Sequence, residues 1–325
     1  MKKHLLPSWI GKILSSLKSS VVALCYHRVR QTELDLNKLS VSEDNFHSHL
    51  AWLKENTDTL SVDELFDCIK NARFPKKGSI VTFDDGYADF YSHALPIISS
   101  NNFKTALYIS PVDIASQTLF WWDELEQIVF QKQFLIQWNG AIDISDPVIQ
   151  TSDNSQCQTL RQEFYYKMQR TLRLATFELR TLAMKKLRNA ISSENKSNHL
   201  NRTINKFEFE EILNHPCVTI GSHGLHHLSM ASQTKSQREK ELKDSKTLLE
   251  TLTKRKITTF AYPYGAQEDI DLVEEEPLKY GYEMCFSVEA GSIGKNSNKL
   301  RLPRMFVENW DKKEFALHFT RYLMS

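Results

Sequence analysis

Two adjacent carboxylates, Asp84 and Asp85, follow an apolar run at residues 78–83, and Gly86 comes directly after them. Neighbouring side chains of a strand point to opposite faces, so the two acids cannot act at the same place. One of them can hold a cation while the other stays free to accept a proton. Acidic turns after strands are common, so an ordinary turn is the alternative interpretation of this segment.

Three histidines, His223, His226 and His227, lie within five residues after a second apolar run at 217–220. One helical turn would bring His223 and His227 to one side, where both imidazoles share a divalent metal. With one carboxylate, two histidine ligands leave coordination positions open, which is typical of a catalytic site. A polar loop without metal is the alternative, and the spacing alone does not exclude His226 as a ligand.

The elements that must position these residues alternate between apolar, strand-like runs and helical periodicity. A third segment, 260–265, also ends a strand, and Pro263 and Gly265 force a tight turn there. Alternating strands and helices predict a parallel sheet or (β/α) barrel, whose sites lie at the carboxyl ends of the strands. We predict strands at 21–26, 78–83, 105–109, 217–220, 259–261 and 284–287, and helices over about 87–100, 236–252 and 313–323.

The alternation stops between residues 120 and 209. Residues 160–191 lack Gly and Pro and predict one long helix or a helical pair. Residues 158–203 carry ten Lys or Arg against three Glu. A solvated basic helix face is one interpretation, and a surface for an anionic glycan carrier or membrane headgroups is the other. Because loops at the carboxyl end of a barrel line its site, we expect this insertion beside the active-site mouth.

Composition limits the class of protein. In 325 residues, Lys and Arg number 41 against 40 Asp and Glu, which does not favour nucleic-acid binding. No apolar run reaches the ~18 residues needed to cross a bilayer. Five scattered cysteines without a CxxC pair predict neither a thiolate zinc site nor a disulfide framework, and they fit a reducing compartment. Residues 1–20 form an amphipathic segment, without signs of a signal peptide, that packs on the core or anchors at a membrane surface.

Taken together and in this order, the segments Thr82–Gly86, Ser222–His227 and Tyr262–Gly265 resemble the polysaccharide deacetylase family. These are the NodB-homology enzymes of carbohydrate esterase family four. The resemblance implies one domain over residues 21–325, a distorted (β/α) barrel of about seven strands with a helical insertion at about 121–210. Three more segments resemble the branch of the family found near surface-polysaccharide genes, namely 24–29, 120–123 and 301–304.

The resemblance also implies a divalent metal, often zinc, that activates water against an N-acetyl group. By position, Asp85, His223 and His227 would be the ligands, and Asp84 would be the general base. This agrees with the chemistry of the residues, because a metal lowers the pKa of a bound water to about 7 and a neighbouring carboxylate can take its proton. The resemblance selects His227 over His226, which becomes a supporting or surface residue.

The substrate side is assigned to the third segment and to the tryptophans before the insertion. The backbone N–H of Tyr264, in the turn made by Pro263, would stabilise the oxyanion. Trp121, Trp122 and the Tyr264 ring are candidates to stack on sugar rings, although aromatic residues before an insertion are more often core.

Two positions depart from the family pattern. Many members carry an arginine that orients the base where this chain has Ala261, and Arg304, or else Arg301, is the candidate to reach in instead. The late segment that supplies the general acid elsewhere has no clear match, since His318 falls in a predicted C-terminal helix. His27, at a strand end, is the preferred acid, and the alternative is a structural histidine satisfied beside Tyr26.

The sequence therefore predicts a metal-dependent N-deacetylase, a hydrolase of non-peptide C–N bonds. Its substrate would be an N-acetylated amino sugar in lipopolysaccharide, in another surface polysaccharide or in a lipid-linked precursor. We expect it in the cytoplasm or at the inner face of the membrane, with peripheral membrane contact and no nucleic-acid partner. A deformylase or other small-acyl amidohydrolase on an amino sugar would use the same machinery, and a catalytically silent glycan-binding domain is the alternative outside enzymology.

Overall fold

The computed structural model describes residues 19–116, 119–130, 158–190, 201–271 and 273–325. The amphipathic segment predicted at 1–20 therefore lies outside the described residues, apart from Ser19 and Ser20. Within the described residues, every helix is too short or too polar to cross a membrane.

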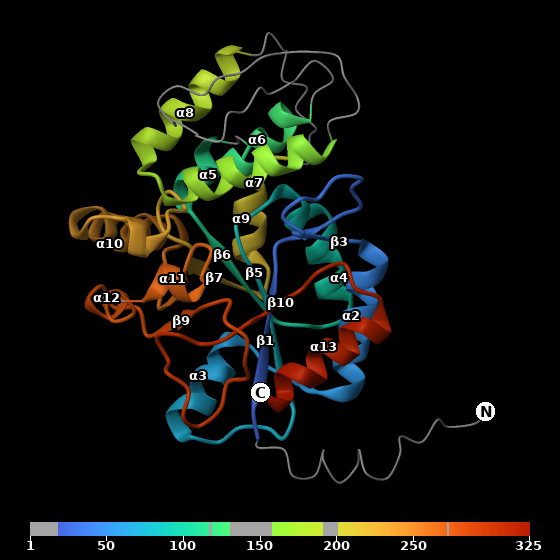
Figure 1. Cartoon of the computed structure of the whole chain (residues 1–325). Helices are drawn as coiled ribbons and strands as arrows, with labels where there is room; N and C mark the ends of the chain where they lie inside the picture. The colour runs from blue at the N-terminus through green and yellow to red at the C-terminus, as the bar shows by residue number, and fades with distance from the viewer. Residues whose placement is uncertain (1–18, 117–118, 131–157, 191–200, 272) are drawn as a thin grey trace.

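A curled parallel sheet occupies the centre of the molecule (Figure 1). The strands are Val21–Tyr26 (β1), Arg28–Val29 (β2), Ser40–Val41 (β3), Asp58–Thr59 (β4), Gly78–Phe83 (β5), Thr105–Ile109 (β6), Val218–Ser222 (β7), Thr259–Ala261 (β8), Met284–Phe286 (β9) and Met305–Phe306 (β10). They run in the order β10-β1-β5-β6-β7-β8-β9, with β4 paired to β5, while β2 and β3 form a separate pair. The predicted fold, a distorted (β/α) barrel of about seven strands, is confirmed.

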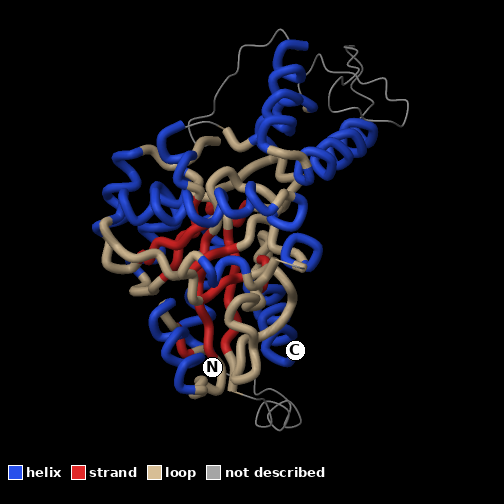
Figure 2. Tube along the Cα trace, turned by 90° about the vertical axis from the view of Figure 1, so that its left-hand side faces the viewer, coloured by secondary structure: helices blue, strands red, loops and turns tan. Residues whose placement is uncertain are grey.

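Helices surround this sheet, and Figure 2 shows them on both sides of the strands. Four of them begin with a capping box, in which the side chains of the cap and of the third helical residue bond each other's backbone N–H. The α-helices are Glu43–Asn56 (α2), Val62–Asn71 (α3), Leu95–Ser100 (α4), Pro111–Ser116 (α5), Trp121–Val129 (α6), Gln158–Leu174 (α7), Phe177–Ala190 (α8), Lys206–Asn214 (α9), Lys235–Thr253 (α10), Gln267–Ile270 (α11), Glu276–Lys279 (α12) and Lys312–Met324 (α13). A π-helical turn lies at Phe90–Ala94 (η1) and a 3-10 turn at Met230–Ser232 (η2).

Burial of both sheet faces explains why the central strands are mostly apolar and carry no charged residue. In β1, Val22, Leu24 and Tyr26 belong to one buried cluster, and Val21 and Ala23 belong to another. Side chains alternate between the faces of a strand, so a continuous apolar run supplies both clusters. Carboxylate and imidazole side chains such as Asp84 and His223 therefore follow the strand ends and do not interrupt the strands.

Two predicted helical regions differ in detail from the expectation. The helix expected over about 87–100 contains the π-helical turn η1 before α4, and Pro96 in the first turn of α4 is compatible with a fresh helical start. The stretch predicted from 160 is a helical pair, because Thr176 interrupts it and its hydroxyl accepts from the Leu179 N–H at 3.3 Å. The expected end of that stretch, Ile191, lies outside the described residues.

The helical insertion, which we define as α6, α7 and α8, has an apolar cluster of its own. Leu125 and Ile128 of α6 pack there with Met168 of α7 and Leu187 of α8. Figure 1 shows the three helices together at the top of the molecule. The insertion is thus a small packed unit on one end of the sheet.

A buried histidine predicts how the stability of this fold depends on pH. His49 lies in contact with the Tyr26 hydroxyl at 3.1 Å and the Trp310 carbonyl at 2.8 Å, and its ring stacks on Phe315. Burial lowers its pKa to about 4. The unfolded chain takes up a proton near the ordinary pKa of 6.5, whereas the folded chain does so only near 4. Stability is therefore lost as the pH falls between these values.

We expect this one group to account for a loss of about 3 kcal/mol in the free energy of unfolding between neutral pH and pH 4. The measurement is urea unfolding of the wild type and His49→Gln across that range. The variant should be less stable at pH 7 but should have a flatter pH dependence. Parallel curves for the two proteins would contradict this assignment.

Candidate active site

Three of the predicted metal ligands converge at the carboxyl ends of β5 and β7. One ligand atom each from Asp85, His223 and His227 lies within 4.8 Å of the others. Asp85 Oδ1 is 3.2 Å from His227 Nε2 and 3.5 Å from His223 Nε2. All three residues are buried. The convergence arises because β5, β6 and β7 are parallel neighbours, so residues that follow β5 and β7 meet at one edge.

The spacing of His223 and His227 suggested a helical turn, but the two histidines do not lie on one. Residues 223–227, which we call the ligand loop, are irregular. Gly224 has a φ of +79° and His227 a φ of +50°, so the backbone is left-handed at two positions of the loop. A Cβ at Gly224 would also lie 3.1 Å from Glu241 Oε2. The loop thus brings the imidazoles together by turns that the four-residue spacing does not reveal.

The donor set fits a divalent cation. His223 Nδ1 is 2.8 Å from the Ala261 carbonyl, so this nitrogen must carry the proton and Nε2 keeps its lone pair toward Asp85. Asp85 Oδ1 is buried and has no hydrogen-bond partner among the described residues. A carboxylate oxygen and two imidazole nitrogens are ligands that zinc accepts in catalytic sites.

Electrostatics favours an ionised Asp85. Burial alone would raise its pKa, but His223 and His227 outweigh burial and hold the pKa below its usual range. Burial also lowers the pKa of His227, whereas the two aspartates outweigh burial at His223 and raise its pKa. The group therefore offers an anionic oxygen beside imidazoles, the charge state in which it can accept a cation.

Asp84 lies beside this group, with its Oδ2 4.0 Å from His223 Nε2, and it pairs with a buried arginine. Arg304 donates from Nη1 to Asp84 Oδ1 at 2.8 Å and from Nη2 to Oδ2 at 2.6 Å. Burial raises the pKa of Asp84, but Arg304 outweighs it and lowers the pKa. The structure thus places Arg304 on Asp84, as expected for a residue that replaces the arginine missing at Ala261. Arg301 instead pairs with Glu289 and does not contact Asp84.

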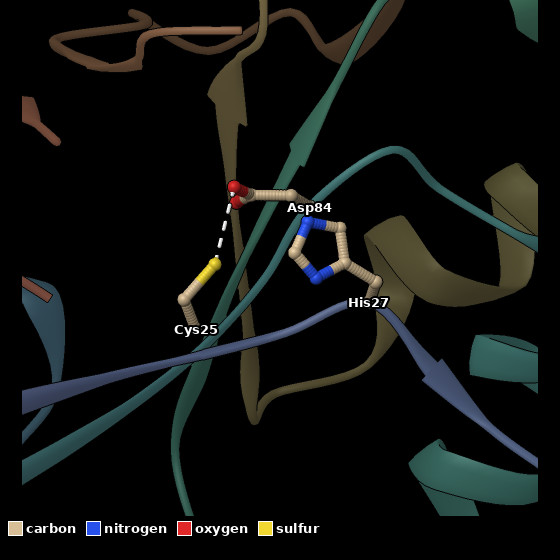
Figure 3. A group of neighbouring side chains, drawn as sticks. All are labelled: Cys25, His27 and Asp84. Carbon is tan, nitrogen blue, oxygen red and sulfur yellow. Dashed lines mark hydrogen bonds between the residues drawn. The ribbon is translucent and has the colours of Figure 1, made fainter. Parts of the chain in front are cut away.

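A thiol and an imidazole complete the surroundings of Asp84 (Figure 3). Cys25 Sγ donates to Asp84 Oδ2 at 3.4 Å, and burial raises the pKa of this thiol well above its usual range. Cys25, His27 and Asp84 also place three donor atoms within 4.8 Å. Arg304 already occupies both oxygens of Asp84, so a second cation there would meet its positive charge. We therefore assign no metal to this group.

His27 is not satisfied by its neighbour Tyr26, whose hydroxyl contacts His49. Its Nδ1 is buried without a hydrogen-bond partner among the described residues, and its ring lies 5.3 Å from that of Phe306. Burial lowers the pKa of His27, so the ring is neutral near pH 7. A neutral, unpartnered imidazole beside Asp84 can accept a proton and pass it on.

One cavity of about 200 Å³ is lined by His27, by the two aspartates Asp84 and Asp85, and by the ligand histidines His223 and His227. Tyr264 and Trp122 contribute to its wall, as predicted for substrate contacts, and Trp122 Nε1 donates to the Tyr87 hydroxyl at 2.7 Å. Pro263 does not line the cavity; it is buried and acts only through the turn that it makes. The remaining lining residues are Asn37, Leu39, Gln169, Val288, Phe306 and Arg173.

The insertion contributes to the cavity, and Gln169 is a lining residue that the sequence did not single out. Gln169 and Arg173 of α7 line the cavity, which places the insertion beside the site as expected. Arg173 pairs with Asp269 and lies over the Tyr264 ring, with its guanidinium carbon 4.7 Å from the ring centre. Arg180 is buried and donates to the His227 carbonyl. These two arginines are not part of a solvated basic face, and nothing in the helical periodicity separates them from exposed Arg170.

His226 is the histidine that stays outside the metal-binding group. Its Nδ1 lies 2.7 Å from Glu241 Oε1, and its ring packs against Phe177 of α8. Its side chain thus fastens the ligand loop to α10 and α8.

Comparison with known proteins relates this chain to polysaccharide deacetylases. The sequence profile of the polysaccharide deacetylase family matches residues 181–284, which contain His223, His227 and Tyr264. The chain is similar to the poly-beta-1,6-N-acetyl-D-glucosamine N-deacetylase of Staphylococcus aureus (strain MSSA476), with 22% identity over 319 residues that cover 92% of this chain and 82% of that protein. The resemblance noted in the three sequence segments is thereby confirmed.

Solved structures share the fold. A polysaccharide deacetylase from Bacillus cereus has a TM-score of 0.57 and 18% identity, over 92% of this chain and 69% of that one. IcaB from Ammonifex degensii has a TM-score of 0.55 and 16% identity, over 95% of this chain and 99% of that one. The architecture of the sheet is therefore common to these proteins at low sequence identity.

Proposed function

We propose that this chain, which belongs to the polysaccharide deacetylase family, is a metal-dependent hydrolase that removes acetyl groups from the amino sugars of a polysaccharide. The observation that carries the proposal is the group Asp85, His223 and His227 at a cavity that also contains Asp84. A metal-binding group beside a separate, oriented carboxylate is what water-dependent amide hydrolysis requires.

Asp85, His223 and His227 would hold the metal, and zinc fits their donor atoms. A divalent cation supplies Lewis acidity there, which polarises the acetyl oxygen and lets water ionise near neutral pH. The Ala261 carbonyl keeps the proton of His223 on Nδ1, so that Nε2 is available for coordination.

Asp84 accepts the proton of the attacking water. Arg304 holds both carboxylate oxygens, which keeps Asp84 ionised and fixes its orientation in the buried site. The water oxygen forms the new bond to the acetyl carbon, and the C–N bond of the amide breaks. Acetate and a free amine are the products.

His27 delivers a proton to the departing amine. Donor atoms of His27 and Asp84 are no more than 4.8 Å apart, so the proton taken by Asp84 can pass to His27 and then to nitrogen. Burial lowers the pKa of His27, which makes its protonated form a ready donor. The backbone N–H of Tyr264 is assigned to the oxyanion, and the φ of +62° at this residue is characteristic of strained functional positions.

We further propose poly-β-1,6-N-acetylglucosamine as the first substrate to test, because the Staphylococcus aureus relative carries that substrate in its name. A lipid-linked glycan is the finer proposal. It is supported by exposed basic residues on the insertion, such as Arg170 and Lys185, which lie on the same two helices as the cavity-lining Gln169 and the buried Arg180.

Acetate release is the measurement that tests the function. The purified chain should release acetate from N-acetylated oligosaccharides, and a chelator should abolish the release until Zn²⁺ is added back. Formate is measured in parallel with N-formylated sugars, because a deformylase would use the same residues. Acetate release that survives complete metal removal, verified by elemental analysis, would reject the metal mechanism. A protein that binds glycan without releasing either acid would be a silent binding domain.

A further inference from the structure

Two buried side chains of opposite charge bond the backbone of the ligand loop. Glu241 of α10 is 2% exposed and accepts from backbone N–H groups of the loop, and Arg180 of α8 is 5% exposed and donates to backbone carbonyls of the loop. Buried charges persist where they are paired or fully hydrogen-bonded. Both side chains satisfy this condition by bonding the backbone of residues 225–227.

The Glu241 carboxylate accepts hydrogen bonds from the ligand loop. Its Oε2 accepts from the backbone N–H of Leu225 at 2.8 Å and of His226 at 2.9 Å. Its Oε1 lies 2.7 Å from His226 Nδ1. Three contacts with one carboxylate fix the first half of the loop on α10.

The Arg180 guanidinium donates hydrogen bonds to two carbonyls of the ligand loop. Its Nη2 donates to the His226 carbonyl at 2.7 Å, and its Nη1 donates to the His227 carbonyl at 3.2 Å. The guanidinium carbon lies 5.5 Å from the ring centre of Trp121 in α6. The planar fork of arginine suits two consecutive carbonyls, which a single ammonium does not match.

The second of these carbonyls belongs to a strained residue. His227 has a φ of +50°, a left-handed conformation that non-glycine residues rarely adopt unless their surroundings impose it. This conformation accompanies the 3.2 Å approach of His227 Nε2 to Asp85. Arg180 bonds the carbonyl of that same residue, so it restrains the backbone on which the imidazole is mounted.

From these contacts we infer that Arg180 is a positioning residue for the metal ligand His227, acting with Glu241 across the ligand loop. The inference rests on the proposed function, because it takes His227 as a ligand. It makes the helical insertion part of the catalytic architecture, since α8 supplies a side chain on which the metal site depends.

Arg188 offers a matched control on the same helix. It pairs with Glu124 and so ties α8 to α6, but the described contacts do not link it to the ligand loop. Removing Arg188 loosens the insertion without changing the bonds to His226 and His227. It therefore separates general loosening of α8 from loss of the Arg180 contacts.

The test is the Zn²⁺ affinity of the purified full-length chain, measured by competition with a chromophoric chelator. Arg180→Ala should weaken Zn²⁺ binding by about 10–100-fold, the range for residues that orient metal ligands. Arg180→Lys should lie between this variant and the wild type, because its ammonium keeps the charge but not the fork. Arg188→Ala should bind Zn²⁺ as the wild type does. Saturating Zn²⁺ should restore most of the turnover of Arg180→Ala.

Thermal unfolding establishes which variants are folded. If Arg180→Ala is unfolded, the Zn²⁺ affinity of Arg180→Lys tests the inference in its place. Unchanged Zn²⁺ affinity in a folded Arg180 variant would overturn the inference, even where the wild type releases acetate. An equal loss in Arg188→Ala would also overturn it, because the effect would then come from loosening of α8. A wild type that binds Zn²⁺ through an Arg180-dependent site but releases no acetate would support the positioning role and reject the proposed function.

Discussion

Replacing Asp84 by asparagine is expected to lower turnover by a factor on the order of 10²–10⁴ while the protein still binds its metal. Asparagine keeps the shape of the side chain and one oxygen for Arg304, which donates to both oxygens in the wild type. It cannot accept the proton of the attacking water. The metal-binding group is retained because Asp85, His223 and His227 supply its donor atoms.

The measurement combines kcat for acetate release with metal content by elemental analysis. Cys25→Ala is the matched control, because Cys25 contacts the same carboxylate at 3.4 Å but keeps its proton, its thiol pKa being raised by burial. We expect this control to retain most of the turnover. An Asp84→Asn protein that has lost its metal would show that Asp84 is a ligand rather than the base.

Removing any one of the three metal ligands should abolish metal binding and activity together. Asp85→Ala, His223→Ala and His227→Ala each delete one of three protein donors, whose atoms lie within 4.8 Å of one another. A divalent cation held by only two protein donors binds far more weakly. The expected result is loss of bound Zn²⁺ in equilibrium dialysis and loss of acetate release in the same variants.

His226→Ala is the control for these three variants. Its imidazole contacts Glu241 and lies outside the metal-binding group, and the backbone bonds from Leu225 and His226 to Glu241 do not depend on it. This variant should keep most of its metal. If Asp85→Ala stayed fully loaded with Zn²⁺ while Asp84→Asn emptied the site, the roles of the two aspartates would be exchanged. If Asp85→Ala and Asp84→Asn both released acetate as the wild type does, the two aspartates after β5 would be an acidic turn without a catalytic role.

Local patterns in the sequence were sufficient for the six longer strands and for most of the site, whereas the two-residue strands β2, β3, β4 and β10 were not predicted. Apolar runs such as 21–26 and 78–83 appear as β1 and β5 because burial of both sheet faces selects uninterrupted apolar residues. The polar residues that follow these runs then lie at one edge of a parallel sheet. This is why the sequence alone groups Asp84, Asp85 and the histidines after β7.

The local pattern was misleading inside the turns. The four-residue spacing of His223 and His227 suggested a helical turn, but Gly224 and His227 have positive φ and the loop is irregular. Pro263 was grouped with Tyr264 as a substrate or oxyanion residue; it is buried and is not among the residues that line the cavity. A four-residue spacing brings two side chains together only where the segment is helical. The backbone of this short loop is instead determined by its contacts with neighbouring helices.

Only the tertiary structure decided which arginines contact the residues of the site. Arg304 lies 220 residues from Asp84 along the chain, and Arg180 lies 47 residues from His227. Arginines such as Arg170 and Arg180 look equivalent along the sequence, yet the first is exposed and the second is buried against the ligand loop. The sequence by itself determined the six longer strands and the chemical groups at their ends, because these depend on neighbouring residues. The partners that orient those groups come from distant segments, and they meet only when the sheet and the helices around it are packed.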